Sequence, residues 1–186
     1  MPSIDSAKIL IISTDGFEQS ELEFPRDQLR AKGATVHVAT LDGKAITGWE
    51  GNSWGREAEA DLKIADAKHS DYDALVIPGG QINPDLLRVE DSVLTLVKDF
   101  ETSGKVIAAV CHAPWVLVEA GVAKGRTMTS YPSVKTDVIN AGANWVDQEV
   151  ATDKGVITSR NPGDLKAFVS KIVEEVEEGV HQRDAA

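Results

Sequence analysis

The chain has 186 residues, of which 42% are hydrophobic and 26% charged, an ordinary globular composition with enough residues for one sizeable core. Its formal net charge of −11 argues against nucleic acids and anionic membranes as direct partners, because both are negatively charged. No apolar run approaches the roughly 20 residues that a membrane-spanning helix needs, and the first residues show no signal-peptide pattern. We therefore expect one domain over residues 1–186, located in the cytoplasm, where a lone cysteine stays reduced.

The first part of the chain alternates predicted strands and helices. Residues 8–13 form the apolar run KILIIS, which is typical of a strand buried on both faces of a sheet. A helix is predicted over 18–31 and closed by Gly33, with Pro25 marking either a kink or a late start. A second strand is predicted over 36–40. This order favours a parallel sheet with helical crossovers.

The middle of the chain interrupts this alternation and then resumes it. Residues 42–66 are rich in turn residues and are predicted to form an antiparallel excursion with a short strand over 61–64. A core strand is then expected over 74–77, a helix over 92–102 and another strand over 105–110. These three elements continue the strand-and-helix order of a doubly wound α/β protein.

Shorter elements are predicted in the last third of the chain. We expect a short strand over 127–129, a helix over 134–141, and a hairpin that pairs 150–152 with 156–159. A final helix over 162–178 begins at a proline, which suits the first turn of a helix. One doubly wound domain accounts for all of these elements.

Cys111, the only cysteine, directly follows the strand over 105–110 and precedes a helix predicted to extend to Ala120. A nucleophile at a strand-to-helix turn points out over the carboxyl edge of a sheet, where α/β enzymes do their chemistry. The small side chains of Ala109 and Ala113 permit the sharp turn that this arrangement needs. Because helix amides favour a thiolate, we expect a reactive thiol with a lowered pKa. The alternative is an inert, buried cysteine.

Two other strand ends should meet Cys111 at the same edge. Gly79 and Gly80 can present backbone amides, which together with the amide of His112 could hold an oxyanion. Glu18 opens a helix beside the cysteine, and we expect it to be protonated and hydrogen-bonded to the sulfur, because a carboxylate next to a thiolate is unfavourable. The alternatives are that the glycines are only turn residues and that Glu18 only favours the helix dipole.

Neither a cofactor nor a metal site is predicted. One cysteine and scattered histidines give no compact ligand spacing, and no glycine-rich phosphate loop follows any strand. We expect His37, His69 and His181 to be structural or solvated. The loop that holds Trp49 and Trp54 could line either a pocket or an interface.

Several segments together resemble the DJ-1/PfpI superfamily, and specifically its PfpI-like branch of general stress proteins. They span nearly the whole chain in the family's order: KILIISTDGFEQSELEFPRDQL, DYDALVIPGGQINPDLLR, KVIAAVCHAPWVLVEAG and TSRNPGDLKAF. The family's usual Cys-His-Gly-Pro appears as Cys111-His112-Ala113-Pro114, in which alanine is still small enough for the turn. The resemblance implies a flavodoxin-like α/β sandwich, with a mostly parallel sheet, helices on both faces and a nucleophile elbow. It also implies a homodimer or a larger homo-oligomer.

The resemblance also implies roles for individual residues. Cys111 matches the reactive cysteine, Glu18 the carboxyl that hydrogen-bonds it, and Gly79 with the amide of His112 the oxyanion-binding backbone. In PfpI-like members an acid of a neighbouring subunit orients the histidine, and Asp85 occupies that place here. A Cys-His-acid triad assembled across a dimer interface would follow.

Three functions remain open on this resemblance. The leading hypothesis is a cofactor-independent, cytoplasmic stress-response enzyme that acts through Cys111 on reactive aldehydes or glycated adducts, as glyoxalases and deglycases do. The first alternative is an intracellular cysteine peptidase with a Cys-His-Asp triad. The second is an oxidative-stress sensor or chaperone without turnover, in which Cys111 itself is oxidised.

Overall fold

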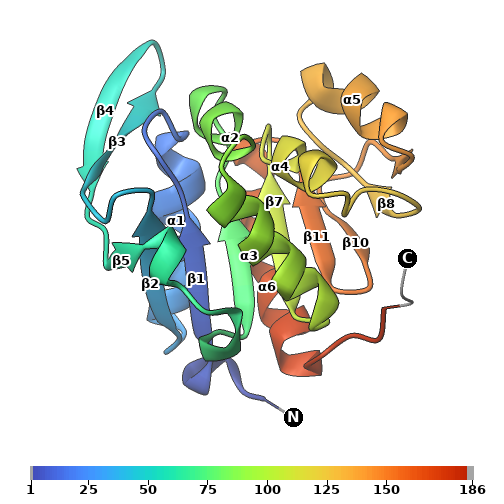
Figure 1. The fold of residues 1–186 in the computed structure, drawn as a ribbon, viewed down its shortest axis with the longest axis horizontal. Coiled ribbons are helices and arrows are strands. Elements are labelled where there is room, and N and C mark those ends of the chain that lie inside the picture. Colours follow the sequence, from blue (N-terminus) through green and yellow to red (C-terminus); the bar gives the residue numbers. More distant parts are fainter. Residues whose placement is uncertain (1, 184–186) are drawn as a thin grey trace.

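The computed structural model describes residues 2–183 and is built on one seven-stranded sheet (Figure 1). The strand order is β10-β11-β7-β6-β1-β2-β5, and each neighbouring pair is parallel except β10 with β11. The strands are β1 (Lys8–Ile12), β2 (Thr35–Thr40), β5 (Leu62–Lys63), β6 (Ala74–Ile77), β7 (Val106–Val110), β10 (Ala151–Asp153) and β11 (Val156–Ser159). The predicted fold class, a mostly parallel α/β sandwich, is confirmed.

Helices cover both faces of this sheet. One face is covered by α1 (Gln19–Ala31) and α6 (Leu165–Glu178), which pack against each other. On the other face, α3 (Asp91–Thr102) and α4 (Pro114–Glu119) pack on β7, and α2 (Ile82–Leu87) and α5 (Lys135–Asn140) pack beside α4. Figure 1 shows α3 and α4 in front of the strands and α6 behind them. Within residues 2–183, no helix combines the length and the apolar character needed to cross a membrane.

The apolar run of β1 explains why the sheet has a core on each side. Successive side chains of a strand point to opposite faces. The four isoleucine and leucine residues at positions 9 to 12 of β1 are all fully buried. Ile9 and Ile11 belong to the core under α1 and α6, whereas Leu10 and Ile12 belong to the core under α3 and α4. The parallel pairing of β1 with β6 and of β6 with β7 then brings the carboxyl ends of these three buried strands to the same edge of the sheet.

Outside the main sheet, two small pairs of strands complete the fold. The antiparallel excursion expected within residues 42–66 is present as the hairpin of β3 (Ile46–Glu50) and β4 (Ser53–Ala58). The short strand expected over 61–64 is present as β5, which joins the main sheet in parallel with β2. A parallel pair of β8 (Thr127–Met128) and β9 (Asn144–Trp145) flanks α5.

The structure differs from the sequence-based expectation in two helices. Helix α1 runs without interruption through Pro25, so a late start at this proline is wrong. Helix α2 was not predicted, because Gly80 before it and Pro84 within it are both typical of loops. Its six residues place Asp85 and the neighbouring apolar side chains on a short helix beside the carboxyl edge of the sheet.

Candidate active site

Cys111 occupies a sharp turn between β7 and α4. Its φ angle is 64°, a left-handed conformation that a non-glycine residue adopts only when the surrounding structure holds it there. Two backbone hydrogen bonds do so. The amide of Cys111 donates to the carbonyl of Ser159 at 3.0 Å, and its own carbonyl accepts from the amide of Tyr131 at 2.8 Å. The nucleophile elbow that the sequence indicates is therefore present, and it is fastened on both sides.

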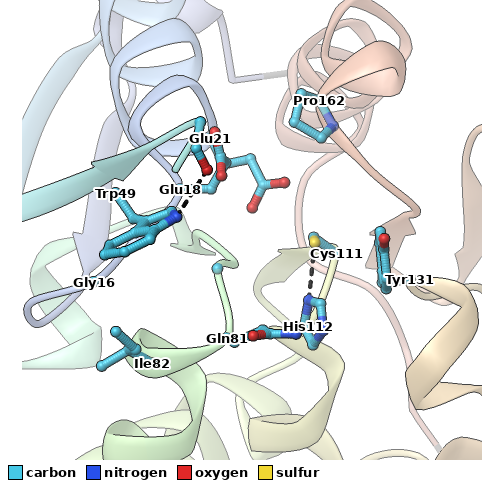
Figure 2. A pocket seen from close by; sticks show the side chains of 12 residues that line it. Gly16, Glu18, Glu21, Trp49, Gln81, Ile82, Cys111, His112, Tyr131 and Pro162 are labelled. Carbon is cyan, nitrogen blue, oxygen red and sulfur yellow. Dashed lines mark hydrogen bonds between the residues drawn. The ribbon is translucent and has the colours of Figure 1, made fainter. Parts of the chain in front are cut away.

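A cavity of about 510 Å³ lies at the carboxyl edge of the sheet, over this elbow (Figure 2). Its volume is in the range of small-molecule sites. Its walls come from segments far apart in the sequence, and they consist of Gly16, Glu18, Glu21, Trp49, Gly51, Gly80, Gln81, Ile82, Cys111, His112, Tyr131 and Pro162. The Trp49 and Trp54 loop thus contributes Trp49 to a pocket, while Trp54 packs edge-on against it and is 55% exposed.

The carboxyl group next to the sulfur is that of Glu21, which the sequence analysis did not select. Glu21 is fully buried in the first turn of α1, and its side chain lies beside that of Cys111. Its Oε2 atom also accepts a hydrogen bond of 2.8 Å from the amide of Gly79. The prediction that Glu18 makes this contact is therefore wrong by one helical turn.

Glu18 lies at the mouth of the cavity instead. It is the residue before α1, with an extended backbone (φ −62°, ψ 120°), so its side chain leaves the chain in a different direction from that of Glu21. It is half-buried and lines the cavity with Trp49 (Figure 2). Burial and the nearby charge of Glu50 raise its pKa above the usual range.

Burial dominates the ionisation of the Glu21 and Cys111 pair. It raises the pKa of the Glu21 carboxyl to about 8, with a further contribution from the charge of Glu18. It also raises the pKa of the Cys111 thiol, as does a charged Glu21, whereas hydrogen bonds from the amides of Gly80 and His112 lower it. The expected low thiol pKa is therefore wrong, because desolvation outweighs these two amides. Near neutral pH, Glu21 holds a proton that it can donate to the sulfur.

The two glycines after β6 have different roles from those expected. The amide of Gly79 is already bonded to Glu21, so Gly79 is not a free oxyanion donor and that prediction is wrong. The amides of Gly80 and His112 face the sulfur and can still receive negative charge. A Cβ atom at position 79 would lie 2.6 Å from the Cβ of Cys111, so only glycine permits this close approach.

His112 faces Cys111 although the two residues are adjacent in the chain. Its Nδ1 atom lies 3.1 Å from the sulfur, and its Nε2 atom lies 3.2 Å from the hydroxyl of Ser133. The ring stacks on Tyr131 with centroids 4.6 Å apart and meets the edge of Trp115. Burial lowers the pKa of His112, so the imidazole is neutral at physiological pH and can accept a proton from the thiol.

Asp85 lies on the exposed side of α2 and makes no hydrogen bond or ion pair with His112 within this chain. The apolar side chains around it are also accessible: Ile82 is 38% exposed and Leu86 42%. The role expected for Asp85 concerns a neighbouring subunit, so it stays a prediction.

Among residues 2–183, one group of side chains has the spacing of metal ligands: Glu175, Glu178 and His181. It lies near the C-terminal end of α6, where the His181 amide bonds to the carbonyl of Gly104, two residues before β7 begins. This is the edge of the sheet away from Cys111. The Nε2 atom of His181 there lies 3.2 Å from Oε2 of Glu175.

Comparison with known proteins agrees with this geometry. The model of the DJ-1/PfpI family matches residues 7–175. The chain belongs to the DJ-1/PfpI family. It is 39% identical to Deglycase PfpI of Pyrococcus furiosus over 166 residues, which cover 89% of this chain and 97% of the relative. It is 41% identical to the putative cysteine protease YraA of Bacillus subtilis over 164 residues, or 88% and 94% of the two chains.

The fold of a solved family member is also similar. The crystal structure of Drosophila melanogaster DJ-1beta superimposes with a TM-score of 0.83 at 34% identity, covering 93% of this chain and 95% of the other. Relatives named as a deglycase and as a putative cysteine protease support a cysteine-based hydrolase or lyase activity in this family member. The resemblance seen in the sequence is therefore confirmed.

Proposed function

We propose that this protein is a stress-response enzyme that uses Cys111 to remove reactive 2-oxoaldehydes or their adducts from amines, as a glyoxalase or deglycase. The observation that carries this proposal is the position of the sulfur, between the Nδ1 atom of His112 at 3.1 Å and the protonated carboxyl of Glu21, on the wall of a small cavity. The arrangement provides a nucleophile, a base for its proton and a second group that can move protons.

The first step transfers the thiol proton to His112 while the sulfur attacks the aldehyde carbon. His112 then returns this proton to the oxyanion, which gives a hemithioacetal. The amides of Gly80 and His112 stabilise the oxyanion that develops. When the substrate is an amine adduct, the amine leaves with the proton held by His112, and the same sulfur–carbon bond forms.

In the second step Glu21 gives its proton to the oxygen of the adjacent carbonyl, and the carboxylate so formed takes the proton from the aldehyde carbon, which gives an enediol. Glu21 then delivers that proton to the adjacent carbon and takes the proton of the hydroxyl group on the former aldehyde carbon, which restores its protonated form. One carbon is oxidised while its neighbour is reduced, so the step needs no external oxidant or reductant and yields a thioester. Water then cleaves the thioester, releases a 2-hydroxy acid and restores the thiol. Glu21 replaces Glu18 as the proton shuttle because it is the carboxyl that contacts the sulfur.

The cavity favours a small substrate without phosphate groups. Among residues 2–183, no lysine or arginine lines it, whereas Glu18 and Trp49 do. A carboxylate and an indole face suit an aldehyde or an adduct on a cationic amine better than an anion. The net charge of −11 likewise disfavours anionic substrates, and it disfavours nucleic acid as a direct partner.

A cysteine peptidase is the second candidate, and the contact between Cys111 and His112 supports it. The same pair could transfer an acyl group from a peptide. However, the β3–β4 hairpin places Trp49 over the cavity (Figure 2), and a peptidase must admit an extended chain. The deglycase proposal is therefore the simpler fit to the cavity.

We also propose a cytoplasmic homodimer or larger homo-oligomer in which α2 contributes to the contact surface. In such an assembly Asp85 of one chain would lie near His112 of the next and complete a triad. The accessible side chains of Ile82 and Leu86 support this surface, because exposed apolar residues gathered on one short helix commonly mark an interface.

Parallel turnover assays of the wild type and Cys111→Ser test the proposal. One assay follows lactate formation from methylglyoxal, a second follows release of the free amine from methylglyoxal-treated N-acetyllysine, and a third follows peptide release from casein. We expect turnover in the first two assays and none in the variant. Peptide release alone would establish the peptidase. No turnover in any of the three assays, together with a mass gain at Cys111 under peroxide, would favour a redox sensor.

A further inference from the structure

We infer that Ser133 is a positioning residue that fixes the tautomer of His112, so that the Nδ1 atom facing Cys111 is the one that accepts the thiol proton. The consequence of this role of Ser133 for turnover rests on the function proposed above. The effect of Ser133 on the Cys111 and His112 pair does not rest on that function, and this effect can be measured without any substrate.

The inference starts from the two nitrogen atoms of one imidazole ring. Nδ1 lies 3.1 Å from the sulfur of Cys111, and Nε2 lies 3.2 Å from the hydroxyl oxygen of Ser133. A neutral imidazole carries a proton on only one nitrogen, and the partner of the other nitrogen decides which one. The hydroxyl oxygen of Ser133 can accept a hydrogen bond from Nε2–H, and in that arrangement Nδ1 is left free to act as a base.

The direction of the hydrogen bonds agrees along the whole chain of groups. The amide of Gly79 holds the carboxyl of Glu21 beside the sulfur, and the raised pKa of this carboxyl leaves it a proton that it can direct to the sulfur. The thiol then donates its own proton to Nδ1 of His112, and Nε2–H donates to the oxygen of Ser133. With the reversed tautomer, Nδ1–H would donate to the sulfur and Nδ1 could not accept the thiol proton.

The segment that carries Ser133 is itself fixed to the elbow. Tyr131 donates its amide to the carbonyl of Cys111 at 2.8 Å and stacks on the His112 ring with an interplanar angle of 22°. Trp115 meets the His112 ring in a T-shaped contact and is itself held by a hydrogen bond of 2.7 Å from its Nε1 atom to Asp137. These contacts leave the ring little freedom to turn, so the hydroxyl of Ser133 meets Nε2 rather than another atom.

Ser133 provides this contact within one chain. It is exposed, so replacing it does not open a hole in the core. By contrast, Asp85 makes no contact with His112 in its own chain and could act only from a neighbour. Ser133 therefore offers Nε2 a partner before any assembly, and an acid from a second chain would act in addition to this contact.

The experiment compares the wild type with Ser133→Ala, Ser133→Thr and Asp85→Asn in the full-length protein. One readout is the rate of Cys111 alkylation by iodoacetamide from pH 5 to pH 9. The other is the ¹⁵N spectrum of histidine-labelled protein, in which the His112 signals are assigned by their loss in His112→Ala. The two ring nitrogens have distinct shifts, so the spectrum reports the tautomer directly.

We expect Nε2–H in the wild type and a mixture of tautomers in Ser133→Ala. Loss of one hydrogen bond to the imidazolium should slow alkylation near pH 7 about tenfold and shift the His112 titration to lower pH. Ser133→Thr, which keeps the hydroxyl, should restore both readouts, and Asp85→Asn should leave the tautomer unchanged. An unchanged spectrum and rate in Ser133→Ala would overturn the inference, as would a tautomer change in Asp85→Asn alone. Absence of turnover in the wild type and in all the variants would contradict the proposed function but not this inference.

Discussion

The Oε2 atom of Glu21 accepts a hydrogen bond of 2.8 Å from the amide of Gly79, and this bond holds the carboxyl against the sulfur of Cys111. The two partners come from the first turn of α1 and from the loop after β6. Their contact is possible only because position 79 has no side chain, since a Cβ atom there would be 2.7 Å from the carbonyl of Val110. A buried, protonated acid beside a nucleophile is the group on which the proposed proton transfer depends.

Glu21→Gln and Glu18→Gln form a matched pair that locates the proton shuttle. Glutamine at position 21 keeps the size of the side chain and its hydrogen bonds but cannot exchange the proton. We therefore expect kcat for methylglyoxal to fall by about 100-fold or more in Glu21→Gln, with little change in KM. Glu18→Gln should retain most of kcat, because that carboxyl does not contact the sulfur. A larger loss of kcat in Glu18→Gln would contradict this assignment.

The dependence of kcat/KM on pH should be bell-shaped. Activity should rise as His112 loses its proton, at a pH below the ordinary histidine value of 6.5, because burial lowers its pKa. It should fall near pH 8, as Glu21 loses the proton that it must supply. The rates of Glu21→Gln, measured over the same range, should show no decline near pH 8. If activity still declines near pH 8 in this variant, another titrating group causes the decline.

The elbow and the sheet were predictable because local pattern and burial agree there. The apolar runs of β1, β6 and β7 are buried on both faces, and the small residues around Cys111 leave few alternatives for the turn. The resemblance also identified the correct helix for the acid. It gave the wrong residue, since the position of a carboxyl depends on where α1 begins, and sequence patterns define helix ends poorly.

A signal for Glu21 was nevertheless present in the sequence. It lies on the same face of α1 as Leu22, Pro25 and Leu29, all of which are buried, whereas Glu18 precedes the helix. A charged residue on an apolar helix face indicates a buried carboxyl with a special partner. No comparable signal exists for Ser133, because it meets His112 only through the folding of the segment after β8.

The free energy of unfolding should depend on pH through Glu21. Its pKa rises from about 4.5 in the unfolded chain to about 8 in the folded protein. The folded state therefore favours the protonated acid, and this contribution is complete below pH 4.5 and is lost as the pH rises to 8. The free energy of unfolding of the wild type should thus fall relative to that of Glu21→Gln by a few kcal/mol as the pH rises over this range. Urea titrations at pH 5, 6.5 and 8 measure it, and equal differences at all three would refute the assignment.

Gly79→Ala should impair both folding and activity. The added methyl group would lie 2.6 Å from the Cβ of Cys111 and would press on Glu21, so backbone must shift at the elbow. We expect a destabilisation of about 1–3 kcal/mol and a slower reaction of Cys111 with iodoacetamide. Gly125→Ala is the control, because its left-handed backbone (φ 76°) strains any side chain but nothing lies within 4 Å of the new atom. It should lose about 1 kcal/mol and keep full thiol reactivity, and equal reactivity in the two variants would argue against a tight contact at position 79.

The last prediction concerns assembly through α2. If Asp85 supports His112 from a neighbouring chain, activity requires at least a dimer and both Asp85→Ala and Cys111→Ser should be inactive or nearly so. Ser133 would then accept a hydrogen bond from His112 in its own chain and could pass its own hydroxyl proton toward the neighbour's carboxylate. Mixing the two variants forms interfaces that combine an intact cysteine with an intact aspartate, so part of the activity should return.

Subunit exchange must be demonstrated in the same mixture, for example by mass spectrometry of chains that carry different isotopes. Leu86→Glu serves as a second test, because a charge on the exposed face of α2 should weaken a contact that buries this side chain, which is 42% exposed in the single chain. We expect it to reduce both the oligomer and kcat while leaving the folded monomer intact. Complete exchange without any recovery of activity, together with an active Leu86→Glu monomer, would show that Asp85 has no role across an interface and that each chain carries a complete site.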